Sequence, residues 1–306
     1  MSLYRNAASP RLFQASMHEI TTPKDMRAWS RAERARGRRL GFVPTMGALH
    51  EGHLRLVDRA KERTDCVVLS VFVNPLQFGP KEDFSNYPRD LARDRTLATE
   101  RGVDCLFMPE VQAMYPAEPL VRVAPGPMAD TLEGAARPGH FAGVLTVVAK
   151  LFHIVEPDVA VFGRKDFQQA MLVRRMAADL DFGLEVDIAP TVRELDGLAL
   201  SSRNSYLDAD QRRAALALSR ALRAVEQAWR SGEADPKALQ RRGMQALMAP
   251  GVSPGYLELV DEQLRPVARV DARSVVVIAA QVGDTRLIDN VVLGEGVASD
   301  IAVRTS

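Results

Sequence analysis

The chain has 306 residues, a length that favours two domains over a single core. Lysine and arginine together number 40 and the acidic residues 39, so the sequence suggests no broad basic surface for nucleic acid and favours small-molecule partners. No apolar run reaches the roughly 18 residues of a membrane span, and Cys66 and Cys105 lie in apolar runs typical of buried reduced thiols, which predicts a soluble, cytoplasmic protein with no membrane partner.

Short β-branched runs alternate with helical patterns over the first two thirds of the chain, after a tail, residues 1–16, that is expected to be disordered. The predicted strands are Leu40–Pro44, Cys66–Val73, Val103–Met108, Asp158–Phe162 and Leu184–Ile188. The predicted helices are His53–Arg63, Asp90–Arg101, Val144–Val155 and Phe167–Leu180. This alternation is typical of βαβ units and predicts a Rossmann-like, doubly wound α/β fold with a parallel sheet.

The segment Pro109–Gly139 is rich in glycine and proline and too long for an ordinary connection, so it is expected to be a binding loop, with an irregular excursion near the site as the alternative. After Pro190 the pattern changes. Helices are predicted at Asp208–Arg230 and Pro236–Met248, and strands at Tyr256–Val260, Val275–Ala280 and Arg286–Val292. We therefore expect a Rossmann-like binding domain over residues 1–190 and a smaller α+β lid domain over residues 191–306.

The segment Pro44–His53 follows the first predicted strand and leads into a helix. Ligands of doubly wound sheets bind at the carboxyl ends of strands, where a helix N-terminus offers free N–H groups to phosphate. Gly47 and Gly52 allow close backbone approach, and His50 and His53 lie one turn apart. Two alternatives stay open, namely surface histidines in an early helical turn and a metal site, although no third metal ligand is evident nearby.

A second polar cluster, Gly163–Gln169, follows the strand that ends at Phe162 and again enters a helix. Lys165 can place a point charge next to phosphate. A cation in the first turn of a helix is unfavourable beside the positive end of the helix dipole, so its presence there indicates a role other than stabilising the helix. Asp166 can accept from a ribose hydroxyl or simply cap the helix. This cluster therefore favours nucleotide binding, with capping as the structural alternative for Asp166.

Two further polar segments lie at the predicted domain boundary and directly after a predicted strand. Ser201, Ser202 and Arg203, within the stretch from Asp196 to Asn204, form a candidate phosphate clamp, since a guanidinium can bind oxygens in pairs, but such a run is also common in solvated turns. The amides of Asn74–Gly79 suit recognition of hydroxyls and carboxylates, and loop capping is the alternative there.

Other phosphate and nucleophile motifs fail. The spacing from Gly134 to Gly139 imitates a P-loop, but His140-Phe141 stands where lysine and serine or threonine belong. Gly294-Glu295-Gly296 lacks a third glycine and a following helix, and no nucleophile elbow occurs. Catalysis by positioning and charge, without a covalent enzyme intermediate, is what remains.

Five motifs occur in order between Pro44 and Leu207: P-T-M-G-A-L-H-x-G-H, F-V-N-P-x-Q-F, R-P-G-H-F-x-G-V, G-x-K-D-x-Q-Q and S-S-R-N-x-Y-L. The first resembles the HIGH-type signature of adenylating nucleotidyltransferases, and Leu200–Arg203 stands where those enzymes carry a KMSKS-like loop. The whole set resembles the pantothenate synthetase (pantoate–β-alanine ligase) family over roughly residues 17–300.

The resemblance implies an enzyme that joins pantoate to β-alanine through pantoyl adenylate, releasing AMP and pyrophosphate, with Mg²⁺ held by ATP phosphates and by no side chain. It implies a homodimer. It implies that His53, the family's acid, acts with His50, Lys165, Ser201, Ser202 and Arg203 in catalysis. It implies ATP contacts for Met46, Gly47, Ala48, Leu49, His50, Glu51, Gly52, His53, Gly163, Arg164, Lys165, Asp166, Val192, Leu200, Ser201, Ser202 and Arg203. It implies that Gln77 and Gln169 hold pantoate, and it places Asn74, Met46, Arg137 and His140 among the substrate-binding residues.

Two positions depart from the family pattern: Arg164 stands where glutamate is common, and Leu200 where methionine is common. We expect these to tune nucleotide affinity and to leave the reaction unchanged. One alternative is a nucleotidyltransferase acting on a phosphorylated small molecule. A non-catalytic nucleotide-binding protein is another, but the charges around a leaving pyrophosphate argue against it.

Overall fold

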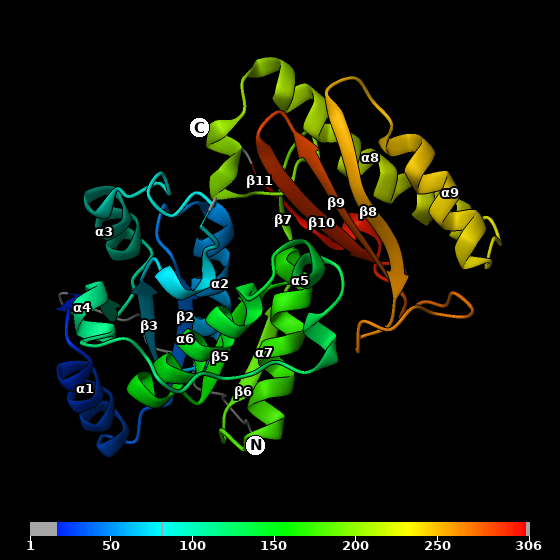
Figure 1. The fold of residues 1–306 in the computed structure, drawn as a ribbon. Coiled ribbons are helices and arrows are strands. Elements are labelled where there is room, and N and C mark those ends of the chain that lie inside the picture. The colour runs from blue at the N-terminus through cyan, green and yellow to red at the C-terminus, as the bar shows by residue number, and fades with distance from the viewer. Residues whose placement is uncertain (1–16, 81, 304–306) are drawn as a thin grey trace, which may run out of the picture.

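The computed structural model describes residues 17–80 and 82–303, so the predicted tail at residues 1–16 lies outside the described part of the chain. A six-stranded sheet with helices on both faces stands beside a three-stranded sheet backed by two helices (Figure 1). The fold class, α/β with a parallel central sheet and a smaller second sheet, is confirmed. The division into domains at residue 190 stays a prediction.

The larger sheet is parallel throughout and runs in the order β1-β4-β3-β2-β5-β6. Its strands are β1 (His18–Ile20), β2 (Leu40–Thr45), β3 (Cys66–Val71), β4 (Cys105–Phe107), β5 (Val159–Gly163) and β6 (Glu185–Ala189). Every residue of β3 is buried, which is why the strand is a valine-rich, largely apolar run without alternation of polar and apolar residues.

Helices cover both faces of this sheet. Phe42 and its neighbours on one face pack against α1 (Pro23–Ala35), α6 (His140–Val155) and α7 (Phe167–Asp179). Val43, which points to the opposite face, packs in a core that includes residues of α2 (Glu51–Arg63) and α3 (Leu91–Glu100). Because successive strand residues point to opposite faces, this alternation produces the doubly wound arrangement.

The position of β2 creates the binding edge. From β2 the chain adds β3 and β4 on one side, while β5 and β6 lie on the other. The helices that follow β2 and β5 therefore diverge at the carboxyl ends of these two strands, at Thr45 and Gly163. Such a switch point is where ligands enter doubly wound folds.

The smaller sheet is antiparallel, with strands β8 (Val252–Val260), β9 (Val275–Val282) and β10 (Thr285–Val292). The helices α8 (Ala209–Arg230) and α9 (Pro236–Leu247) cover the face of this sheet that is turned away from the larger sheet (Figure 1) and form with it a separate apolar core. Two short parallel strands, β7 (Val192–Glu194) and β11 (Ile301–Val303), pair between the two parts.

Several element boundaries differ from the predictions. Helix α2 begins at Glu51 because the side chain of His50 caps it, so the predicted start at His53 is wrong by two residues. Helix α6 begins at His140, before the predicted Val144, and the loop ahead of it contains the short helices α4 (Val111–Met114) and α5 (Glu133–Ala136). The strands β1, β7 and β11 and the helix α1 were not predicted. Within residues 17–80 and 82–303, no helix combines the length and apolar character needed to cross a bilayer.

Candidate active site

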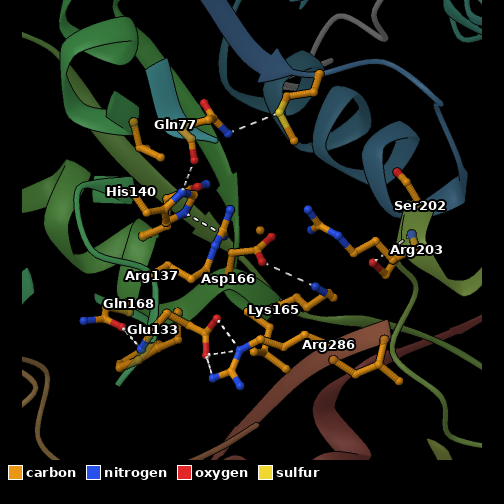
Figure 2. A pocket seen from close by; sticks show the side chains of 18 of the residues that line it. Gln77, Glu133, Arg137, His140, Lys165, Asp166, Gln168, Ser202, Arg203 and Arg286 are labelled. Carbon is orange, nitrogen blue, oxygen red and sulfur yellow. Dashed lines mark hydrogen bonds and ion pairs between the residues drawn. The ribbon is translucent and has the colours of Figure 1, made fainter. Parts of the chain in front are cut away.

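A cavity of about 930 Å³ lies between the carboxyl edge of the larger sheet and strand β10. Its floor includes Thr45 and Gly163 at the ends of β2 and β5. Figure 2 shows Lys165 and Asp166 between Arg137 on one side and Arg203 on the other. The predicted site residues that line it are Met46, His50, Gly52, His53, Gln77, Arg137, His140, Gly163, Lys165, Asp166, Gln169, Val192, Leu200, Ser201, Ser202 and Arg203.

Three residues expected to contact the nucleotide, Gly47, Ala48 and Leu49, are absent from the cavity wall. The N–H groups of Ala48 and Leu49 donate to the buried carboxylate of Asp94, at 3.0 and 2.7 Å. The N–H of Gly47, at φ +83°, donates to Thr45. These three N–H groups therefore hold the turn ahead of α2 in shape.

Three other predicted residues have structural partners away from the cavity. The carboxylate of Glu51 pairs with Arg101 at 2.6 Å, and the guanidinium of Arg164 pairs with Glu295 at 2.5 Å. Neither residue lines the cavity, and their nucleotide contacts stay predictions. Asn74 is also buried outside the wall, and it acts on the site through Gln77.

The two histidines form a reciprocal cap at the start of α2. His50 Nδ1 accepts from the N–H of Gly52 at 3.1 Å, and His53 Nδ1 accepts from the N–H of His50 at 3.4 Å. Their rings stack with centroids 4.0 Å apart. Both Nδ1 atoms are acceptors, so a neutral ring carries its proton on Nε2, the donor left for a ligand.

The surroundings of the histidines keep both rings neutral. Burial is the main cause that lowers the pKa of His50 to about 2 and that of His53 to about 4. The charge of Lys165 acts in the same direction on both, while the Asp166 carboxylate opposes the shift of His53. The histidines therefore contribute hydrogen-bond donors to the cavity and no net charge at neutral pH. Because they line the cavity, the alternative that they are ordinary surface residues is wrong.

Lys165 and Asp166 occupy a 3₁₀ turn between β5 and α7. The Lys165 ammonium lies 3.3 Å from the Asp166 carboxylate. Asp166 stands at the N-cap of α7, but its side chain makes no capping hydrogen bond, so the capping alternative is wrong. Asn290 on β10 donates to the carbonyls of Arg164 and Lys165, which ties the turn to the smaller sheet.

The serine–arginine segment is anchored on both sides of the cavity. Arg203 donates to both oxygens of Asp83, at 3.1 and 3.0 Å, and the Ser202 hydroxyl donates to the carbonyl of Ala48 at 3.4 Å. These contacts join the third polar segment to the first, so the alternative of a solvated turn is wrong.

The amide of Gln77 is held in place from several directions. Its Oε1 accepts from Asn74 at 3.1 Å, and its Nε2 lies 3.2 Å from the sulfur of Met46. The carbonyl of Gln77 lies 2.8 Å from His140 Nδ1. Tyr115 donates to Asn74 at 3.0 Å, which completes the set of partners that fixes this loop. Asn74 therefore positions the amide that faces the cavity.

Arg137 and His140 form a second charged cluster. Arg137 pairs with both oxygens of Glu82, at 2.8 and 2.6 Å, and lies 3.0 Å from His140 Nε2. Burial first, and then the charge of Arg137, lower the pKa of His140 to about 4. The charge of Arg137 is thus already balanced by a carboxylate, as that of Arg203 is by Asp83.

The sequence reasoning missed the carboxylates that hold the cavity arginines. Glu82, Asp83 and Glu133 pair with Arg137, Arg203 and Arg286, respectively. It also missed Asp94, which holds the turn after β2, and Tyr87, which lines the cavity. The adjacent acids Glu82-Asp83, directly after a predicted binding loop, were the one local signal for any of them.

Comparison with known proteins gives consistent matches. The family model described as pantoate-beta-alanine ligase matches residues 18–292. The pantothenate synthetase of Pelotomaculum thermopropionicum is 52% identical over 276 residues, which cover 90% of this chain and 98% of that protein. The crystal structure of pantothenate synthetase from Thermus thermophilus is 48% identical, with a TM-score of 0.86 and coverage of 90% and 99%. Pantoate-beta-alanine ligase from Francisella tularensis, solved with beta-gamma ATP and beta-alanine, is 32% identical, with a TM-score of 0.77 and coverage of 92% and 100%.

Proposed function

The chain belongs to the pantoate-beta-alanine ligase family, and from that premise we propose how its own residues join pantoate to β-alanine with cleavage of ATP to AMP and pyrophosphate. The observation that carries the proposal is the meeting of three distant segments around one cavity. Lys165, Ser202 and Arg203 lie there together with His53 and Gln77. This set combines cationic and neutral donors for phosphate with an amide suited to a hydroxy acid.

The first step brings one anion toward another. A pantoate carboxylate oxygen attacks the α-phosphorus, a new P–O bond forms, and the bond to the bridging oxygen of pyrophosphate breaks. Lys165 and Arg203 would offset the developing charge, while the Nε2–H groups of His50 and His53 donate to phosphate oxygens. Because both rings are neutral, they would act as hydrogen-bond donors and would not add positive charge.

The second step releases AMP. The neutral amine of β-alanine attacks the acyl carbon of pantoyl adenylate, the bond from that carbon to the AMP oxygen breaks, and the amine loses a proton. Gln77 and Gln169 would hold the pantoyl hydroxyls, and Asp166 and Val192 would border the nucleoside. Holding the reactants in line can supply roughly 7–11 kcal/mol of the barrier.

The donor set fits a Mg²⁺ ion that arrives with the nucleotide. Within the described ranges, no group of three or more histidines, cysteines and acids could hold a metal. Glu82, Asp83 and Glu133 each hold an arginine, and Asp166 pairs with Lys165. Mg²⁺ readily binds through substrate phosphates and water, so the phosphates of ATP would hold it here without a side-chain ligand. When bound, the ion would neutralise phosphate charge.

The proposal extends to three properties of the whole protein. The boundary between a nucleotide- and pantoate-binding domain and a lid domain would lie near residue 190, between β6 and β7. The protein would work in the cytoplasm, and it would form a homodimer. Analytical ultracentrifugation over a range of concentrations tests the last point.

Exchange of labelled pyrophosphate into ATP tests the function. The exchange should require pantoate, and AMP should appear when β-alanine is added. A nucleotidyltransferase acting on a phosphorylated small molecule would release pyrophosphate but no AMP, because the nucleotide stays in its product. Exchange supported by another acid but not by pantoate would reassign the substrate.

A further inference from the structure

An ion pair that the reaction chemistry does not use closes one side of the cavity. Glu133 belongs to α5, and Arg286, 153 residues later, belongs to β10 of the smaller sheet. Arg286 Nη2 lies 2.5 Å from Glu133 Oε1, and Nε lies 3.1 Å from Oε2. Figure 2 shows the pair beneath Lys165, and both side chains line the cavity. The pair therefore joins the two parts of the molecule at the cavity wall.

The Glu133 end of the pair is rigidly held. Its N–H donates to Gln168 Oε1 at 3.0 Å, and Gln168 in turn donates to the carbonyls of Met128 and Thr131. A side chain at Gly134 would place its Cβ 1.6 Å from the carbonyl oxygen of Ala129, so this turn permits only glycine there. A carboxylate fixed in this way offers a defined docking point to a mobile partner.

The Arg286 end is also oriented by its surroundings. Its guanidinium lies 5.9 Å from the ring centroid of Tyr256 on β8, a distance at which the ring attracts the cation. The Glu133 carboxylate is thus oriented by contacts within the larger part of the molecule, and the Arg286 guanidinium by contacts within the smaller sheet. A bidentate bond between two preset groups fixes the angle as well as the distance between those parts.

A second ion pair between the two parts lacks these features. Arg174 of α7 pairs with Glu262, after β8, at 3.0 Å, but the side chains are 41% and 58% exposed and neither lines the cavity. The corresponding fractions for Arg286 and Glu133 are 29% and 9%. An exposed pair such as Arg174–Glu262 contributes little to stability. Taking the charges of Glu133 and Arg286 out of water is costly, so the position of this pair explains its presence better than a gain in stability does.

We propose that Glu133 and Arg286 are positioning residues that clasp the smaller sheet over the cavity and retain pantoyl adenylate until the amine arrives. The inference rests on the proposed function. An acyl adenylate is open to water: a water oxygen attacks the acyl carbon, the bond to AMP breaks, and pantoate and AMP are lost without product. Excluding water from the closed site prevents that reaction.

The variant Glu133→Gln tests the clasp, because it keeps the size of the side chain and removes its charge. Pantoate-dependent pyrophosphate exchange should stay within about threefold of the parent. Release of AMP in the absence of β-alanine should rise about tenfold or more, since a hydrogen bond between charged groups corresponds to roughly a tenfold to hundredfold change in an equilibrium. The half-life of enzyme-bound labelled adenylate should shorten to match.

The matched control is Glu262→Gln, which breaks the exposed pair between the same two parts and should change neither quantity. Unchanged AMP release in Glu133→Gln, or an equal rise in the control, would overturn the clasp. If Glu133→Gln fails to fold, Arg286→Lys carries the same test, because an ammonium keeps the charge and loses the paired geometry. A parent enzyme without pantoate-dependent exchange would instead refute the proposed function, and the clasp with it.

Discussion

Replacing Lys165 with alanine separates a catalytic role from a structural one. The ammonium faces the cavity with a side chain that is 19% exposed, and the carboxylate of Asp166 lies 3.3 Å away. Losing such a partly exposed pair should cost the fold roughly 0–1 kcal/mol. Losing the charge should slow adenylate formation by about 10²–10³, the usual effect of removing one donor that stabilises transition-state charge.

The assay is single-turnover formation of AMP together with urea unfolding of the same preparation. Lys61→Ala is a suitable control, because that ammonium binds the carbonyl of Arg101 at 2.9 Å and lies outside the cavity wall. The control should keep the parent rate. If Lys165→Ala formed the adenylate at a rate within threefold of the parent, the proposed role of the Lys165 charge in this step would be refuted.

Three further predictions concern residues around the cavity. Asp94→Asn should weaken ATP binding about tenfold or more in isothermal titration, because an amide cannot accept from both Ala48 and Leu49 as the carboxylate does; unchanged affinity would contradict this. The folded pKa of His140, about 4, lies below the unfolded value of 6.5, so the unfolded chain binds more protons between them and stability falls as the pH drops through that window. Between neutral pH and pH 5, His140 should account for a loss of about 2 kcal/mol in the free energy of unfolding. Urea unfolding of His140→Gln should therefore show a fall in stability over this pH range that is smaller by about 2 kcal/mol. Gly143→Ala should raise the KM for pantoate more than the KM for ATP. The new Cβ would lie 2.1 Å from the carbonyl oxygen of Leu76 and would displace the loop that carries Gln77, the proposed pantoate ligand. Equal changes in the two KM values would contradict this prediction.

Much of the fold could be predicted because its elements carry strong local patterns. The apolar run of β3, broken only by Ser70, and the long amphipathic pattern of α8 each indicate their element without help from the rest of the chain. Strands β7 and β11 could not be predicted in this way. Each has three residues, and each becomes a strand only because the other lies beside it.

The candidate site divides along the same line. His50, Lys165 and Ser202 were found because each stands in a motif at the end of a predicted element, and the fold brings them to one cavity. The partners of the cavity arginines were not found, because Glu82 and Glu133 lie 55 and 153 residues from the arginines they bind. Two residues so far apart in the sequence form no local pattern from which their ion pair could be predicted.

The short strand β11 has a practical consequence for handling the protein. Its pairing with β7, reinforced by the 2.6 Å bond from Arg193 to Asp300, places Ile301–Val303 beside Val192–Glu194, and Val192 lines the cavity. Truncation before Ile301, or a bulky fusion attached just after Val303, will loosen that wall at a point far from either edit in the sequence. Affinity tags for purification should therefore be joined at the other end of the polypeptide.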